Sequence, residues 1–328
     1  MALRPLNCRR LYRPAAFAAL CMAITGGPGP ALAKATYTTF DAGFVTSVNA
    51  INSVTGYRGD GDSFVRTADG TVTTFSVAGA HATQAESMNN GSEIAGYYFD
   101  SAGAGHGFMR VSDGTITTFD VTGASGTFPV SLNNKGEIAG SYRDHAGVHG
   151  FVRTTGGRLK TIDVPGSSDT EASSISDKGM IVGTYVVGGR SHSFVRAADG
   201  TITAIDVPGA VATDATSINA KGTIAGFYSD SGGTIHGFVR TADGTITAFD
   251  GHNCGFIQPT GINSKGTISG YCINTNNQGH YMGFARRPNG TFQTFQVPGG
   301  GTRTMPAGIN DAGVIAGNYN FGGFLRFP

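Results

Sequence analysis

TYTTFDAGF, residues 36–44, is the stretch that decides the fold of this chain, because it recurs downstream in a different context. Six related stretches follow, beginning at residues 71 (TVTTFSVAG), 115 (TITTFDVTG), 159 (LKTIDVPG), 201 (TITAIDVPG), 245 (TITAFDGHN) and 291 (TFQTFQVPG). Each of the six follows a tight turn and a run that contains Gly-Phe or Ser-Phe, whereas residues 36–44 follow only the N-terminal segment. The first copy is therefore one quarter of a repeat, without the three quarters that precede it elsewhere.

A complete repeat contains four short β-like runs. In one copy these are a run ending in Ser-Ile-Asn (217–219), TIAGFY (223–228), GFVRT (237–241), and a fourth run after an Asp-Gly turn (243–244). Asp-Gly or Asn-Gly between alternating runs is the strongest short-range signal for a β-hairpin. The third run is marked by Phe64, Phe108, Phe151, Phe194, Phe238, Phe284 and Phe324, spaced 40 to 46 residues apart. Four antiparallel strands in a unit of this length are typical of a β-propeller blade.

The strand count predicts how the repeats close. The first three runs each occur seven times, but the fourth occurs six times after them, and the chain ends at Pro328 directly after the seventh Gly-Phe run. We expect residues 36–41 to supply the missing outer strand by pairing with residues 322–327, since an unpaired edge would promote aggregation. An open solenoid would instead need atypical capping units at both ends. The sequence therefore predicts one all-β domain, residues 34–328: a seven-bladed β-propeller of four-stranded antiparallel blades, its last blade completed by the N-terminal strand.

The N-terminal segment has the pattern of a secretory signal peptide, residues 1–33. Four arginines precede a short apolar run at 15–24, and the segment ends in a small-x-small pattern at Ala31 and Ala33. Ten apolar residues are too few to span a bilayer. We expect cleavage after Ala33 and a secreted or periplasmic protein with no membrane span. Cleavage leaves two cysteines, Cys254 and Cys272, and an oxidising compartment favours a disulfide between them.

Composition narrows the classes of partner. The formal net charge is +1, 14% of residues are charged, and no basic run occurs after the leader. Nucleic acid and anionic lipid both require clustered Lys and Arg, so neither is an expected partner. The 52 glycines fit the turns of a β-rich fold. The sequence predicts a monomer.

The repeat also resembles a known family. Its pattern, HGFVRTADGTITTFDVPGA followed by SINxKGxIAGxYxD, is similar to the extracellular HAF-type repeat of bacterial exported proteins, over nearly the whole chain after the leader. The resemblance implies an exported repeat protein. It carries over no activity and no catalytic residue.

Recurring polar residues are interpreted as structural. A histidine precedes Gly-Phe or Ser-Phe at His106, His149, His192 and His236, and we expect each to make the same local hydrogen bond rather than to join a metal site. The tyrosines Tyr98, Tyr142, Tyr185, Tyr228 and Tyr319 are expected to pack with a polar tip. Loop acids such as Asp60, Asp62, Asp100, Asp144 and Asp230 could ligate Ca²⁺, but no complete calcium loop is present, so no metal or cofactor is predicted. Arg58-Gly59-Asp60 matches the integrin-binding tripeptide and is expected by chance in a Gly-rich chain.

Function is expected where the repeat is broken, on one face. We call this the loop-rich face: it carries the loops between the second and third strands and the connections from each fourth strand to the next repeat. Around the axis mouth on this face, the innermost strands place Phe44, Gln84, Phe128, Glu171, Asp214, Gln258 and Met305, with Glu171 and Asp214 a possible carboxylate pair. The sixth repeat departs most, bringing His252, His280 and Tyr281. Arginines are scattered over the same loops at Arg58, Arg143, Arg190 and Arg303.

Two functions of different class fit these residues. The first is a non-catalytic exported propeller that binds a glycan, peptide or protein through the loop-rich face, although the absence of Trp weakens a sugar-stacking version. The second is an extracellular polysaccharide lyase or glycoside hydrolase with its site at the axial mouth. No nucleophile elbow, zinc-ligand pair or phosphate loop decides between them.

Overall fold

The computed structural model describes residues 35–276, 279–320 and 322–328. These residues form 28 β-strands and no helix, within one compact unit, Ala35–Pro328. No helix in this part of the chain could cross a membrane. The predicted leader, residues 1–33, lies outside the described residues.

The strands fall into seven groups of four, which we number as repeats one to seven. Repeat one is β2 (Phe44–Val48), β3 (Val54–Tyr57), β4 (Ser63–Arg66) and β5 (Val72–Phe75). Repeat two is β6 (Ala82–Met88), β7 (Ile94–Phe99), β8 (Gly105–Arg110) and β9 (Ile116–Phe119). Repeat three is β10 (Gly126–Leu132), β11 (Ile138–Arg143), β12 (Val148–Arg153) and β13 (Leu159–Ile162). Repeat four is β14 (Asp169–Ile175), β15 (Ile181–Val187), β16 (Arg190–Arg196) and β17 (Ile202–Ile205).

The remaining three repeats follow the same order. Repeat five is β18 (Ala212–Ile218), β19 (Ile224–Ser229), β20 (Ile235–Arg240) and β21 (Ile246–Phe249). Repeat six is β22 (Cys254–Ile262), β23 (Ile268–Asn274), β24 (Tyr281–Arg286) and β25 (Phe292–Phe295). Repeat seven is β26 (Thr304–Ile309), β27 (Ile315–Tyr319) and β28 (Gly322–Phe327), with β1 (Thr36–Phe40) at its outer edge. Single parallel bridges at the starts of β10 and β14 join repeats two, three and four into one sheet.

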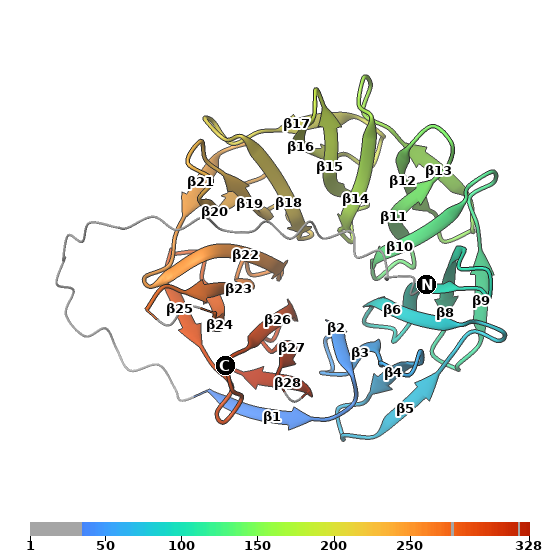
Figure 1. Cartoon of the computed structure of the whole chain (residues 1–328), viewed down its shortest axis with the longest axis horizontal. Coiled ribbons are helices and arrows are strands. Elements are labelled where there is room, and N and C mark those ends of the chain that lie inside the picture. Colours follow the sequence, from blue (N-terminus) through green and yellow to red (C-terminus); the bar gives the residue numbers. More distant parts are fainter. Residues whose placement is uncertain (1–34, 277–278, 321) are drawn as a thin grey trace. The chain divides into compact units, whose positions relative to one another are not determined.

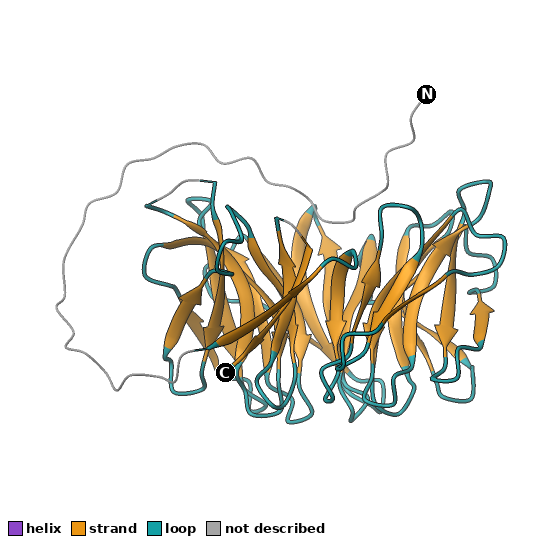
Figure 2. Ribbon diagram, turned by 90° about the horizontal axis from the view of Figure 1, so that it is seen from below, coloured by secondary structure: helices purple, strands orange, loops and turns teal. Residues whose placement is uncertain are grey.

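Within residues 35–328, the repeats follow one another around a common centre, with the first strand of each innermost and the fourth outermost (Figure 1). The strands run between two faces that carry the turns (Figure 2). Because each repeat is an antiparallel meander, its first and third turns lie on one face. The second turn and the connection to the next repeat lie on the other, which is the loop-rich face.

The N-terminal strand pairs with the C-terminal strand. β1 lies antiparallel to β28, from Thr36 opposite Phe327 to Phe40 opposite Gly323. This register confirms the pairing predicted from the strand count.

Repeats one and seven also contact each other through their inner strands. The backbone N–H of Val45 donates to Oδ1 of Asn318 at 2.7 Å, and the Asn318 amide donates back to the Val45 carbonyl at 2.9 Å. The Asn310 amide donates to the Asn49 carbonyl at 2.9 Å. The two ends of the series are therefore hydrogen-bonded neighbours.

The repeated phenylalanines form the centre of the core. All seven, Phe64, Phe108, Phe151, Phe194, Phe238, Phe284 and Phe324, are fully buried. Burying one such side chain contributes roughly 1.5–3 kcal/mol. Each repeat thus contributes one equivalent, fully buried phenylalanine to the core.

A second inter-repeat contact was not predicted. The arginine that ends a third strand lies over the aromatic ring that ends the preceding repeat's fourth strand, as Arg66 lies 4.6 Å from the Phe40 ring centroid and Arg110 lies 4.9 Å from that of Phe75. The same contact recurs at Arg153, Arg286 and Arg326. Each cation–π pair of this kind contributes about 0.5–2 kcal/mol. Since Phe40 belongs to β1, the first of these contacts also ties the N-terminal strand to repeat one.

Candidate functional site

Two carboxylates lie close together on neighbouring inner strands of the loop-rich face. Glu171 is on β14 and Asp214 is on β18, and both are half-buried. The Ser191 hydroxyl of β16 donates to Asp214 at 3.5 Å. Burial, reinforced by the negative charge of Glu171, raises the pKa of Asp214 to about 6, despite the opposing hydrogen bond. The predicted carboxylate pair is therefore present, and one member titrates near neutral pH.

Arg190 lies at the start of β16. Its side chain is exposed, and the following residue is Ser191, which bonds Asp214. Repeat four thus supplies a carboxylate from β14 and a hydroxyl and an exposed guanidinium from β16.

Repeats six and seven bring three further predicted residues together. The Tyr271 hydroxyl, on β23, donates to the Gln258 side chain at 2.6 Å. The Tyr271 ring meets that of Tyr281 edge-on at 5.9 Å, and the exposed Arg303 lies over the Tyr281 ring at 5.2 Å. These contacts form a continuous row from an inner strand of repeat six to the connection that enters repeat seven. Tyr271 was missed because its position holds different residue types in other repeats, such as Ser141 and Thr184, so no recurring pattern marks it.

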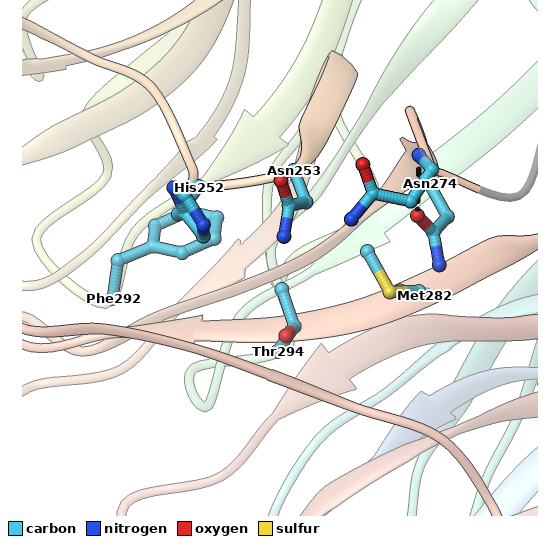
Figure 3. A pocket seen from close by; sticks show the side chains of 7 residues that line it. His252, Asn253, Asn274, Met282, Phe292 and Thr294 are labelled. Atoms are coloured by element: carbon cyan, nitrogen blue, oxygen red, sulfur yellow. Dashed lines mark hydrogen bonds between the residues drawn. The ribbon is translucent and has the colours of Figure 1, made fainter. Parts of the chain in front are cut away.

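A cavity of about 210 Å³ lies beside the connection that enters repeat six. Its lining residues are His252, Asn253, Asn274, Asn276, Met282, Phe292 and Thr294. In Figure 3, His252 and Phe292 lie at one end, Asn274 and Met282 at the other, and Asn253 and Thr294 between them. We call this the repeat-six cavity. Of its residues, only His252 was named from the sequence.

The cavity occupies the place of a side-chain cluster found in other repeats. Cys272 pairs with Met282 across β23 and β24, as Tyr98 pairs with His106 in repeat two. There the tyrosine and histidine rings stack at 5.0 Å. Replacing both rings with a cysteine and a methionine leaves space between the strands.

The outer wall of the cavity depends on a glycine. Gly251 stands where repeats four and six end in the buried valines Val207 and Val297. A Cβ at Gly251 would come within 2.4 Å of the Phe292 ring and 2.7 Å of Cys254 Cβ. Glycine at this position therefore lets Phe292 line the cavity.

Solved structures of other proteins share this fold. No family model and no curated protein matches the chain. A virginiamycin B lyase from Staphylococcus aureus, a catalytically inactive variant solved with quinupristin, is 14% identical and matches with a TM-score of 0.62, covering 89% of this chain and 98% of that one. A streptogramin B lyase is 14% identical with a TM-score of 0.61 over 89% and 97%. The Dos1 propeller is 9% identical with a TM-score of 0.52 over 88% and 94%.

The chain folds as a β-propeller. Identities of this size show the architecture alone, and the activities of these proteins are not carried over by them.

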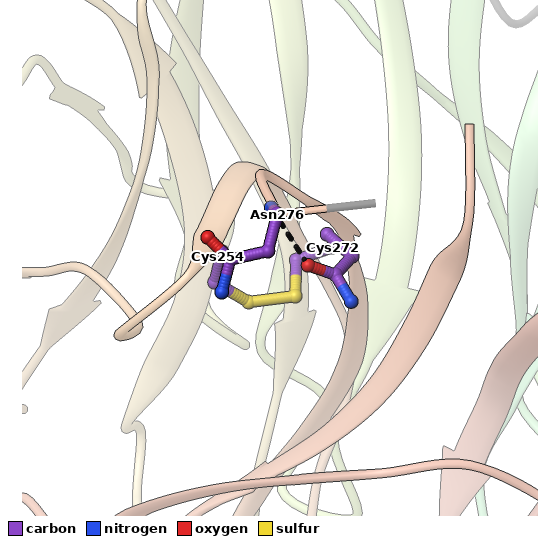
Figure 4. The surroundings of a disulfide bond; sticks show 4 residues. Cys254, Cys272 and Asn276 are labelled. Atoms are coloured by element: carbon purple, nitrogen blue, oxygen red, sulfur yellow. Dashed lines mark hydrogen bonds between the residues drawn. A yellow bond between two sulfur atoms is a disulfide. The ribbon is translucent and has the colours of Figure 1, made fainter. Parts of the chain in front are cut away.

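The propeller contains the predicted disulfide in repeat six. Cys254 and Cys272 are bonded, with Cα atoms 5.5 Å apart (Figure 4). The bridge links the start of β22 to β23 and leaves both cysteines buried. The same segment contains two non-glycine residues with left-handed backbone, Asn253 (φ 57°) and Phe256 (φ 48°), next to a bulge between Gly255 and Gln258. For an aromatic residue this conformation is rare and costs about 1–3 kcal/mol.

The two histidines that the sixth repeat brings have different contacts. His252 lines the repeat-six cavity. His280 is not among the described lining residues, and its backbone carbonyl accepts the Asn274 N–H at 2.8 Å.

Arg58 lies apart from both carboxylates and cavity. Its Nε lies 3.0 Å from Oδ2 of Asp60 in the same loop, so the first and third residues of the Arg-Gly-Asp tripeptide form an ion pair with each other. An exposed pair of this kind contributes little to stability.

The repeated histidines of the propeller make the local bonds that were predicted. Nδ1 of His106, His149, His192 and His236 lies 2.7–3.0 Å from an aspartate of the adjacent fourth strand or its end. Nε2 of His149 also lies 3.2 Å from Asp144 in the preceding loop. Each ring stacks on the tyrosine of the neighbouring strand at 5.0–5.3 Å. In the part of the chain that the structure describes, no group of acids, histidines and cysteines could hold a metal ion.

These bonds predict a pH dependence of stability. The hydrogen bond that His106 donates to Asp120 is the largest cause of a raised pKa at His106, and the one that His149 donates to Asp163 raises the pKa of His149. A raised folded-state pKa stabilises the fold below the ordinary value near 6.5, and the contribution is lost as pH rises through the folded pKa. We expect the free energy of unfolding in urea to fall between pH 6 and 8. The fall should be smaller in the H106Q/H149Q variant than in H145Q, a control at an exposed histidine. Equal slopes in the two variants would contradict the prediction.

A second cavity, of about 190 Å³, lies on the axis at the opposite face. All seven repeats line it with the apolar residue that ends the first strand and with one or both of the residues that follow, as with Val48 and Ala50 or Ile309 and Asp311. Some of these apolar residues, such as Met88 and Leu132, also pack between the repeats. The recurring Ser-Ile-Asn motif was the signal for this cavity.

Proposed function

We propose that the chain is an exported, seven-bladed β-propeller, closed by β1 against β28, that binds an extracellular glycan, peptide or protein through its loop-rich face. Seven four-stranded groups, the pairing of β1 with β28, and the hydrogen bonds between repeats one and seven support the closed ring. The leader pattern and the disulfide support export.

The observation that carries binding is the convergence of non-repeated polar residues on this face. Glu171 and Asp214 come from repeats four and five, and the row from Gln258 through Tyr281 to Arg303 comes from repeats six and seven. Carboxylates, an amide and tyrosines can bond hydroxyl and amide groups of a ligand. The two carboxylates and Arg303 are not required by the repeat, because the carboxylates' equivalent first-strand positions hold Phe, Gln or Met in the other five repeats, and no other repeat has an arginine two residues before that position.

Binding of immobilised glycans and peptides to the purified protein tests this proposal. We expect at least one class to be retained by the native protein and lost from the R303A and E171Q/D214N variants. The matched control is D177N, which alters an acid on the opposite face. Retention that persists in both loop-rich-face variants but is lost in D177N would overturn the choice of face.

A second function, polysaccharide lyase or glycoside hydrolase, is favoured by one observation. Asp214 has a pKa of about 6 beside Glu171, and a carboxylic acid that titrates near neutral pH can act as a general acid. Paired carboxylates are also the usual machinery of glycoside hydrolysis. Turnover of a polysaccharide that both E171Q and D214N abolish, with an acid limb near pH 6, would establish the enzyme. Binding without turnover would leave the non-catalytic proposal standing.

Asp214 carries a prediction that does not depend on either function. Its raised pKa means that the ionised form destabilises the folded state, so the protein loses stability as pH rises from about 4 to 6. We expect D214N to unfold at a higher temperature than the native protein at pH 8, with a gain of about 1–2 kcal/mol. At pH 4 the two should be alike. Lower stability of D214N than of the native protein at pH 8 would contradict this prediction, because it would show that the folded state stabilises the ionised Asp214 carboxylate.

A further inference from the structure

We infer that the repeat-six cavity binds one neutral sugar residue, such as the terminal unit of a glycan. The inference rests on the proposed function, because the cavity lies among the connection and the loop that repeat six presents on the loop-rich face. The inference narrows the class of partner from glycan, peptide or protein to the end of a carbohydrate chain. It also places the binding site in repeat six, away from the axis.

Size limits the ligand. A volume of about 210 Å³ is smaller than the roughly 300–1,000 Å³ of sites for drug-sized molecules. It suits a single small ring rather than an extended chain. A ligand attached to a longer polymer would therefore enter by its end.

The lining chemistry suits hydroxyl groups. Asn253, Asn274 and Asn276 present side-chain amides, and Thr294 presents a hydroxyl. An amide both donates and accepts hydrogen bonds, as a sugar hydroxyl does, so each can satisfy the other in either direction. Part of this set is already oriented, because Oδ1 of Asn274 accepts the Asn276 N–H at 2.9 Å and holds the loop (Figure 4).

Apart from the His252 imidazole, the remaining walls are apolar. Phe292 is held in place by stacking on Phe284 at 4.8 Å, and Met282 lines the floor with its thioether. These surfaces can cover the C–H face of a sugar ring. None of the lining residues that the structure describes is an acid, lysine or arginine, so a charged ligand would lose its hydration with only the His252 imidazole to face it.

Three departures from the repeat build the cavity together. Cys272 and Met282 replace a tyrosine–histidine stack, Gly251 replaces a buried valine, and the disulfide ties the two chain segments that form the cavity rim. Asn253 supplies the left-handed residue of this connection, a conformation that asparagine adopts readily, and the neighbouring Cys254 is fixed by the bridge. The bridged backbone holds the rim of the cavity in one shape.

The experiment measures binding of methyl glycosides of glucose, galactose, mannose and N-acetylglucosamine to the full protein, by ligand-observed NMR and calorimetry, with methyl glucuronate as a charged probe. At least one neutral glycoside should bind. The variant T294L, which fills the cavity from β25, should weaken it at least tenfold. T74L is the matched control, since Thr74 holds the same position on β5 and is exposed, and it should bind like the native protein. A second variant, N276A, changes only an exposed residue of the rim and should also bind the glycoside more weakly. It provides the test if T294L fails to fold.

Other outcomes overturn the inference in distinguishable ways. Neutral glycoside binding that survives T294L but is lost in D214N would place the sugar at the carboxylate pair and would leave the proposed function intact. Tenfold tighter binding of glucuronate than of any neutral glycoside would assign the cavity to an anion held by His252. Binding of peptides without binding of any glycoside would overturn the sugar inference but leave the proposed partner-binding function standing. No binding of any probe by the native protein would remove both.

Discussion

A protein that lacks residues 1–40 is expected to be less stable by at least about 3 kcal/mol than one that lacks residues 1–34, and to form oligomers. The truncation removes β1, whose Tyr37 packs on Phe295 and whose Phe40 lies under Arg66. Full burial of an aromatic side chain contributes roughly 1.5–3 kcal/mol, and Tyr37 and Phe40 are each partly buried, so their contacts and the pairing of β1 with β28 together account for the expected loss. Thermal unfolding and light scattering measure the two effects.

Loss of β1 also frees the edge of β28. An unpaired edge strand offers a row of backbone donors and acceptors to other chains, which explains the expected oligomers. A peptide of residues 35–41 added in trans should restore both the monomer and the melting temperature, because it can occupy the same register opposite Gly323 to Phe327. A truncated protein that remains monomeric and equally stable without the peptide would refute the role of β1 as a latch.

Removing the disulfide has the next largest expected effect. The C254A/C272A variant should lose about 2–4 kcal/mol, since the bridge restrains a loop of sequence separation 18 in the unfolded chain. The same variant should bind sugar more weakly than the native protein, because Cys254 follows His252 and Asn253 while Cys272 precedes Asn274 and Asn276 on the cavity rim. Chemical unfolding with and without reductant measures the stability change.

The variant itself supplies the control for this prediction. Reductant should lower the stability of the native protein and leave that of C254A/C272A unchanged. Because both cysteines are buried, we expect the native disulfide to be reduced slowly until the protein begins to unfold. A bridge that is reduced at once without loss of stability would contradict the structural role assigned to it.

The architecture could be predicted because its signals are local and occur seven times. Asp-Gly turns and alternating runs specify hairpins over a few residues, and a weak signal becomes decisive when Phe64 and its six counterparts repeat it. The pairing of β1 with β28 followed from counting strands, although these segments are far apart in sequence. The disulfide followed equally from a count, since two cysteines remained after the leader.

Contacts between repeats could not be predicted in this way. Whether Arg66 meets Phe40, or Asn310 meets the Asn49 carbonyl, depends on how two sheets pack face to face, and no local pattern encodes that geometry. Glu171 and Asp214 were named because equivalent positions in adjacent repeats had to lie near each other. The raised pKa of Asp214 depends on burial, which the sequence does not state.

The repeat-six cavity shows the same division most clearly. Cys272, Met282 and Gly251 were each visible as departures from the repeat, and His252 was named among the candidate residues. Empty space, however, is the difference between the volume that strands enclose and the volume that side chains fill. Three substitutions on three different segments create it only because the fold places them against one another across β23, β24 and the connection before β22.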